Sequence, residues 1–465
     1  MCTHNHESMF STGTEDGSGY VIRILKSPAF LIVVLGLAIR FLLAPFLTYD
    51  FDVYHWGVII ENIQSGNGLY EVAGYYYTPV WGYFLGTLSI LQDALMNLDL
   101  FGIKFTDMLP LEDLICRFHT SIITSPAFNV AMKVPLIICD VAVAILLHWL
   151  VKERTHDERK ATAAVALWML CPTVIYMSGV QTMFDSFSAL MMLLTVILVY
   201  RDRTFIAGAM FSVATLLKFF PAFCIIVLVA YIYVKHRDDG KAIVRIAEAA
   251  VGAGLMTVVL IIPQILDGTV IDALSFVIGR VDGSTDAVMS AVSYVSMALM
   301  LVSMFLFGYK MLRTEGNEDD MLFKYVLLAF ALAMVTSVTP QYMIVFLPFL
   351  ILQLVSSEGR YRACWLLISI GSFIAALSIN NLSLLVATSE YMGMLSSGWI
   401  IDCMQALESI KVLGMDIVSL TNGIGGVIEA VGILLIPIIY YREWISRKVP
   451  AIGGFVSGLR EWKFE

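Results

Sequence analysis

Long apolar segments, repeated along almost the whole chain, constrain the fold more than any other feature of the sequence. A helix that crosses a bilayer needs about 20 apolar residues, and such stretches recur between residues 28 and 441 of the 465. Hydrophobic residues make up 59% of the chain and charged residues only 14%, which excludes an ordinary soluble domain. The sequence therefore predicts an all-α, multi-pass membrane bundle over 28–441, with cytoplasmic tails at 1–27 and 442–465.

The basic residues predict the orientation of this bundle, because Lys and Arg concentrate in the cytoplasmic loops of membrane proteins. Arg23 and Lys26 precede the first apolar segment, and a strongly basic loop occupies 152–160. We therefore place both of these stretches in the cytoplasm. The stretch 48–77 contains acidic residues but no Lys or Arg, which predicts that it lies on the outer face.

The apolar stretch 78–97 decides the number of crossings. If it crossed the membrane fully, the basic loop 152–160 would lie outside. We therefore interpret 78–97 as a membrane-dipping or surface element within one large outer loop, 48–128, which also carries a juxtamembrane helix at 51–64. About 12 crossings then remain. They are expected at 28–47, 129–151, 161–179, 184–200, 204–218, 219–234, 243–264, 288–308, 322–338, 341–355, 362–380 and 424–441.

Polar residues gather at the predicted outer ends of these segments. An ionisable group near membrane depth is costly, so each one is a candidate functional residue. Lys133 and Asp140 lie seven residues apart on one face of a predicted crossing, and they are candidates for the same reason. The others are Asp50, Asp52, Tyr54, Tyr77, Gln181, Asp185, Lys218, Arg280 and Gln341.

The order of short motifs over residues 25–350 resembles that of multi-spanning glycosyltransferases of superfamily C. The similarity is greatest to mannosyltransferases that use polyprenyl- or dolichyl-phosphate mannose. The C-terminal third, including 381–423, matches no family pattern. The motifs are Asp50-Phe51-x-Val53-Tyr54, Gly68-x-Tyr70, Tyr77-Thr78-Pro79, Lys133 with Asp140, Phe184-Asp185-Ser186, Lys218-Phe219-Phe220-Pro221 and Pro340-Gln341-Tyr342.

The resemblance implies an inverting transfer of a hexose, most simply mannose, from a lipid monophosphate to a hydroxyl on the extracytoplasmic side. Its partners would be a lipid-linked sugar donor, a glycan or glycolipid acceptor and membrane lipids. We expect a prokaryotic cell membrane rather than the endoplasmic reticulum. No basic stripe is interleaved with aromatic residues, so the sequence does not indicate nucleic-acid binding.

The resemblance also suggests roles for the candidate residues. A carboxylate must accept the proton of the acceptor hydroxyl, and Asp50 matches the acid of the family's first outer loop. Lys218, with Arg280 behind it, would hold the departing phosphate, and Asp185 would be the second acidic position of the site. The other candidates are expected to bind substrate.

Each assignment has a plainer alternative. Asp50 could only cap the helix near Phe51, and Asp52 is the second candidate for the base, because residues two apart on a helix point in different directions. Lys218 could extend along its helix to the interface, and Lys133 and Asp140 could be a structural pair.

Asp50-x-Asp52 also has the form of a metal-binding motif. A donor with one phosphate needs less charge neutralisation than a nucleotide diphosphate, and no further acidic cluster is evident. We therefore expect no required metal or other cofactor.

A lipid-glycan flippase or a secondary transporter is the alternative function. Transporters are commonly built from internal repeats with polar residues near the bilayer midplane. The sequence shows no such repeat, and its polar residues gather at one predicted face. This pattern favours an enzyme that works at an interface.

Overall fold

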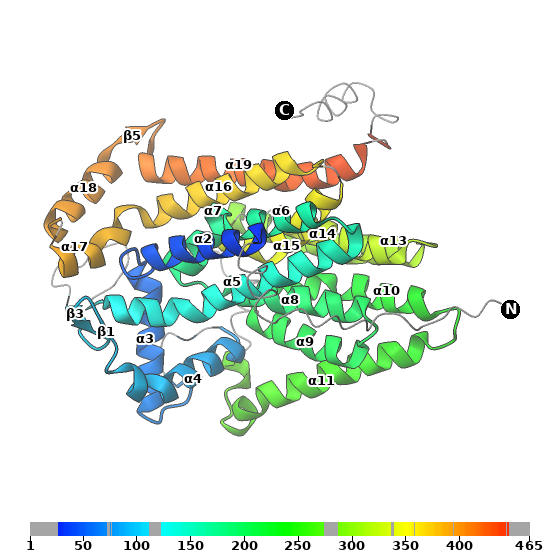
Figure 1. The fold of residues 1–465 in the computed structure, drawn as a ribbon, viewed down its shortest axis with the longest axis horizontal. Coiled ribbons are helices and arrows are strands. Elements are labelled where there is room, and N and C mark those ends of the chain that lie inside the picture. Colours follow the sequence, from blue (N-terminus) through cyan, green and yellow to red (C-terminus); the bar gives the residue numbers. More distant parts are fainter. Residues whose placement is uncertain are drawn as a thin grey trace.

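The computed structural model describes residues 27–71, 75, 77–110, 122–273, 287–335, 339–357, 359–393, 395–442 and 444–445. Long helices run side by side along one direction, and α3 stands across one end of them (Figure 1). The helices of the bundle are α2 (Pro28–Leu43), α5 (Pro126–Thr155), α6 (Glu158–Met169), α8 (Asp185–Tyr200), α9 (Thr204–Leu217), α10 (Ile225–His236), α11 (Ala242–Leu266), α13 (Ala287–Leu312), α14 (Glu318–Met334), α15 (Met343–Ser356), α16 (Arg362–Asn380) and α19 (Ile417–Tyr440).

Shorter elements interrupt or flank the bundle. In the described part of the chain, the strands form three antiparallel pairs. The helical elements are α3 (Asp50–Gln64), α4 (Pro79–Leu95), α7 (Pro172–Tyr176), the π-helix η1 (Met177–Gln181), α17 (Val386–Met392), α18 (Ser397–Ser409), and the 3₁₀ turns η2 (Phe220–Cys224), η3 (Pro340–Tyr342) and η4 (Asn381–Leu385). The strands are β1 (Asp99–Leu100), β2 (Ile103–Lys104), β3 (Leu109–Pro110), β4 (Ile122–Ile123), β5 (Lys411–Val412) and β6 (Met415–Asp416).

Several helices in the described part are long and apolar enough to cross a membrane. These are α5, α11, α16 and α19, and α6 together with Pro172–Gln181 makes a fifth if the two parts, bent by 48°, form one span. The protein is therefore mostly helical, as predicted, with four or five candidate membrane spans. Other apolar helices, such as α8 and α9, are shorter, so the count of about 12 crossings stays a prediction.

The juxtamembrane helix predicted at 51–64 is present as α3. It lies across the end of the bundle that also carries β1, β3, α17 and α18 (Figure 1). Its first residue is Asp50, and its N-cap is Tyr49, which makes no side-chain capping bond. The N-cap position is therefore Tyr49, one residue before the Asp50 that the sequence offered as an alternative cap. The C-terminal stretch 381–423, for which the sequence suggested no family, forms η4, α17, α18 and the β5–β6 hairpin at this same end.

The predicted surface element 78–97 is the helix α4. It packs against α3 and also contacts α9 and α11. The Tyr83 hydroxyl donates to the Leu260 carbonyl at 2.6 Å and lies 2.8 Å from Gln264 Oε1. Hydrogen bonds to α11 therefore fix α4 against the side of the bundle, next to α3.

Small residues allow some of the helices to approach closely. A Cβ added at Gly208 of α9 would lie 2.0 Å from the Ala249 carbonyl oxygen of α11, and one at Gly252 would lie 2.0 Å from the Phe205 carbonyl oxygen. The two backbones are thus in direct contact, as is common between membrane helices. Because α9 also contacts α4, this close packing on α11 fixes α9 beside α4.

Candidate active site

Four of the predicted site residues come together where α3 meets the bundle. Asp52 lies on α3, Gln181 ends η1, Asp185 begins α8, and Lys218 directly follows α9. The Lys218 Nζ lies 3.3 Å from Asp185 Oδ2, and their side chains are 3% and 0% exposed. The alternative in which Lys218 extends to the interface is therefore wrong, because this ammonium group is enclosed beside a carboxylate.

Aromatic faces surround the Lys218 ammonium. Its Nζ lies 4.4 Å from the ring centroid of Phe184, 5.5 Å from that of Tyr77 and 5.4 Å from that of Tyr342. Trp81 stacks on Phe184 with centroids 4.8 Å apart. Ring faces attract cations, and they exclude water, so the charge of Lys218 acts at close range in a medium of low polarity.

Asp52 supplies the second carboxylate of the cluster. Burial raises the pKa of Asp52 to about 7, while hydrogen bonding from Gln181 and the charge of Lys218 lower it and the charge of Asp185 raises it. A carboxylate whose pKa lies near neutrality is well suited to general-base catalysis. Asp52 is therefore a carboxylate of the cluster whose acidity suits this role.

A strained turn presents Gln181 to this cluster. The Met183 amide donates to the Met177 carbonyl at 3.0 Å and closes η1, and Thr182 follows with a φ of 63°. A β-branched residue rarely adopts this left-handed conformation, which costs of order 1–3 kcal/mol. Gln181 Oε1 and Thr182 Oγ1 are buried without a hydrogen-bond partner among the described residues, so the turn offers polar atoms that a bound ligand could satisfy.

An ion pair buried between helices supports this turn. Arg40 Nε of α2 lies 2.9 Å from Asp140 Oδ2 of α5, and both side chains are 0% exposed. Ser178 of η1 donates to the same carboxylate oxygen at 2.6 Å. The Arg40 guanidinium also donates to the Met169 carbonyl at 2.8 Å, so it joins α2, α5, α6 and η1.

Lys133 makes a separate set of contacts to the end of α2. Its Nζ donates to the carbonyls of Ala44 and Leu47, each at 2.8 Å, and to the Thr48 hydroxyl at 2.7 Å. These bonds satisfy carbonyl groups that the end of a helix leaves open. Lys133 therefore fixes the turn through which the chain passes from α2 into α3.

Residues 125–338 of the chain match the profile of glycosyltransferase family 87. The matched stretch belongs to this family. It is a superfamily C family of membrane glycosyltransferases that depend on polyprenyl-phosphate mannose, so the resemblance noted in the sequence is confirmed. No curated protein matched the chain.

The matched stretch of this glycosyltransferase contains Gln181, Asp185 and Lys218, whereas α3 and Asp52 precede it. The structure thus joins a carboxylate from outside the matched stretch to a cluster inside it. In the described part, no three His, Cys, Asp or Glu side chains gather as metal ligands would.

Two of the remaining predicted site residues of this glycosyltransferase lie on segments that contribute to the cluster, and two fall wholly or partly outside the described residues. Tyr54 is half-buried on α3, and Gln341 is half-buried in η3, beside Tyr342. The side chain of Asp50 and the whole of Arg280 fall outside the described residues. Arg40 and Ser178 were not predicted as site residues, and the only signal for Arg40 was a charge inside an apolar segment.

Proposed function

We propose that this glycosyltransferase transfers mannose, with inversion, from a polyprenyl or dolichyl monophosphate to a hydroxyl of a glycan or glycolipid acceptor on the extracytoplasmic side. The buried Lys218–Asp185 pair beside Asp52 carries the proposal, because it combines a cation for a phosphate with a carboxylate for a proton. The location of this cluster beside α3, in the predicted outer loop, supports the extracytoplasmic assignment.

Lys218 is the residue that we assign to the phosphate. An ammonium group enclosed by aromatic rings has few competing water molecules, so its attraction for an incoming anion is strong. Asp185 holds the ammonium at 3.3 Å and fixes its direction. The charge of Lys218 would then stabilise the phosphate as its bond to the sugar breaks.

The base is a carboxylate of α3, and the geometry favours Asp52. In the reaction, the acceptor oxygen forms a bond to the anomeric carbon while the bond from that carbon to the phosphate oxygen breaks. The proton of the acceptor hydroxyl passes to the carboxylate, and the negative charge leaves with the phosphate. Asp50 was the first candidate from the sequence, and its side chain lies outside the described residues.

Gln181 and Thr182 are assigned to the hydroxyl groups of the sugar. Their side-chain oxygens are buried and lack partners in the described part of the chain, and a polar site of this kind rejects ligands that leave its groups unpaired. The strain at Thr182 is of the kind that persists at functional sites.

Transfer by the purified protein tests the proposal. The full chain is incubated with polyprenyl-phosphate mannose and a glycolipid acceptor, and the product is detected by mass spectrometry. A new glycosidic bond of inverted configuration is expected with the wild-type chain. Movement of a lipid-linked sugar across proteoliposomes without any glycosidic product would instead support the flippase or transporter.

A further inference from the structure

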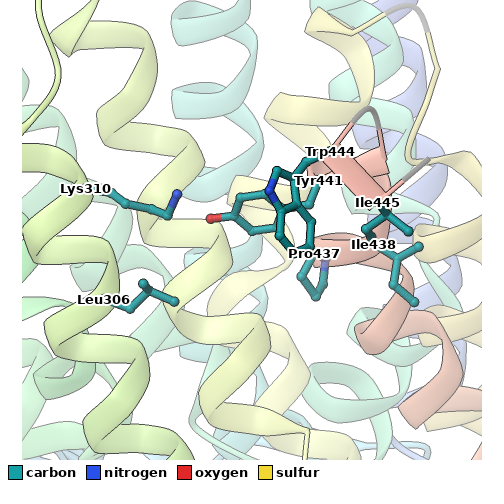
Figure 2. A pocket seen from close by; sticks show the side chains of 7 residues that line it. All are labelled: Leu306, Lys310, Pro437, Ile438, Tyr441, Trp444 and Ile445. Carbon is teal, nitrogen blue, oxygen red and sulfur yellow. The ribbon is translucent and has the colours of Figure 1, made fainter. Parts of the chain in front are cut away.

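A groove separates α13 from α19 at the ends of these two helices, beyond the residues assigned to catalysis. It has a volume of about 500 Å³. Figure 2 shows Lys310 and Leu306 on one side and residues of α19 and the segment after it on the other. The groove is lined by Leu306, Lys310, Pro437, Ile438, Tyr441, Trp444 and Ile445.

The lining changes in character along the groove. Leu306, Pro437 and Ile438 form an apolar wall on helices of the bundle, and Leu306 is 38% exposed. Tyr441 and Trp444 follow the end of α19, and Trp444 is 58% exposed. Tyrosine and tryptophan are enriched where a bilayer meets water, so this order of side chains matches an apolar wall beside acyl chains and an aromatic end at the level of the head groups.

Lys310 places a cation at this aromatic end. Its Nζ lies 4.9 Å from the ring centroid of Tyr441, and in Figure 2 the Tyr441 hydroxyl points toward it. No carboxylate in the described part of the chain forms an ion pair with Lys310. Acids at the start of α14 have other partners, since Asp319 binds Tyr231 and Asp320 pairs with Arg154 and Lys324.

We propose that this groove binds one anionic phospholipid, with an acyl chain along the wall between α13 and α19 and its phosphate at Lys310. Charge complementarity selects an anionic head group, because Lys310 is the charged residue of the groove lining. Basic pockets between membrane helices bind anionic lipids in this way. The proposal does not depend on the catalytic assignment, because none of the groove residues belongs to the active-site cluster.

Native mass spectrometry of the full chain in detergent tests the site, with phosphatidylglycerol and phosphatidylcholine added separately. The wild-type chain is expected to retain one phosphatidylglycerol in preference to phosphatidylcholine. Lys310→Gln should weaken this binding about fivefold, which corresponds to roughly 1 kcal/mol for one basic residue near the membrane surface. Lys411→Gln removes the same charge from the β5–β6 hairpin, which lies away from the groove, and should leave binding unchanged.

A second variant, Leu306→Trp, fills the apolar wall without altering charge and should also reduce binding. Equal retention of the two lipids, or equal binding by the wild-type and Lys310→Gln chains, would overturn the proposal. Displacement of phosphatidylglycerol by an equimolar polyprenyl phosphate would likewise overturn it, because the groove would then be a site for the lipid released by sugar transfer.

Discussion

Removal of the Asp140 carboxylate tests the importance of the ion pair that joins α2, α5 and η1. Asp140→Asn preserves the size of the side chain but leaves the Arg40 guanidinium, which is 0% exposed, without a countercharge. Breaking a buried pair by removing one partner costs about 3–5 kcal/mol, because an uncompensated charge stays buried. The remaining bonds of Arg40, to the Met169 and Gly36 carbonyls at 2.8 and 3.0 Å and to the Ser178 hydroxyl at 3.2 Å, are to neutral acceptors and cannot replace this charge.

The free energy of unfolding is measured by denaturant titration of the detergent-solubilised chain. A double variant, Arg40→Met with Asp140→Leu, removes both charges and should recover most of the loss, since well-packed apolar residues often replace a buried pair without cost. Glu158→Gln is the control, because it breaks an exposed ion pair. Glu158 and its partner Lys152 are 56% and 59% exposed, and an exposed pair contributes about 0–1 kcal/mol. A loss below about 1 kcal/mol for Asp140→Asn, equal to that of the control, would refute the reasoning.

Three further predictions concern acidity, phosphate binding and helix packing. The base must be ionised, and burial raises the pKa of Asp52 to about 7, so kcat/KM should rise with pH through this value. Gln181→Leu should move that rise to higher pH, because Gln181 favours the carboxylate, and an unchanged pH profile would contradict the assignment. The pKa of Asp52 is higher in the folded protein than in the unfolded chain. The free energy of unfolding should therefore fall, through this residue, as the pH rises from about 4 to about 7. Lys218→Gln should lower kcat by roughly 10²–10³-fold in transfer assays, and a change in KM alone would be inconsistent with stabilisation of the leaving phosphate. In thermal unfolding, Gly208→Ala should destabilise the protein by about 1–3 kcal/mol, because the new Cβ meets the Ala249 carbonyl oxygen, whereas Gly254→Ala, with nothing within 4 Å, should not.

The sequence predicted the helices that depend only on the order of residues within them. Apolar length indicated helices such as α5 and α11, and the spacing of apolar residues indicated α3 within one residue of its observed start. The bend between α6 and α7 was missed, because 161–179 was predicted as one crossing. Pro172 marks this bend and the left-handed Thr182 ends η1, but the apolar composition continues through the bend.

The sequence predicted which residues form the site better than it predicted which residues pair with each other. Asp52, Asp185 and Lys218 were all recognised as costly polar residues, and the structure brings them together. The partnership of Arg40 with Asp140, 100 residues apart, leaves no periodic signal, because each charge alone looks like an exception within an apolar helix. The position of Lys218 was also ambiguous, since a lysine at a helix end can reach the interface or be enclosed by aromatic rings that distant segments supply.

Mannose transfer by Asp52→Asn, measured beside wild type and Asp50→Asn, is the most direct test of the account. The purified chains receive labelled polyprenyl-phosphate mannose and a glycolipid acceptor, and the glycosidic product is counted. The account predicts transfer by wild type and a loss of about 10²–10⁴-fold in Asp52→Asn, with unfolding unchanged or improved because the buried carboxylate is gone. Full activity in Asp52→Asn together with a loss in Asp50→Asn would assign the base to Asp50. Full activity in both variants, or no transfer by wild type, would contradict the claim that a carboxylate of α3 drives sugar transfer.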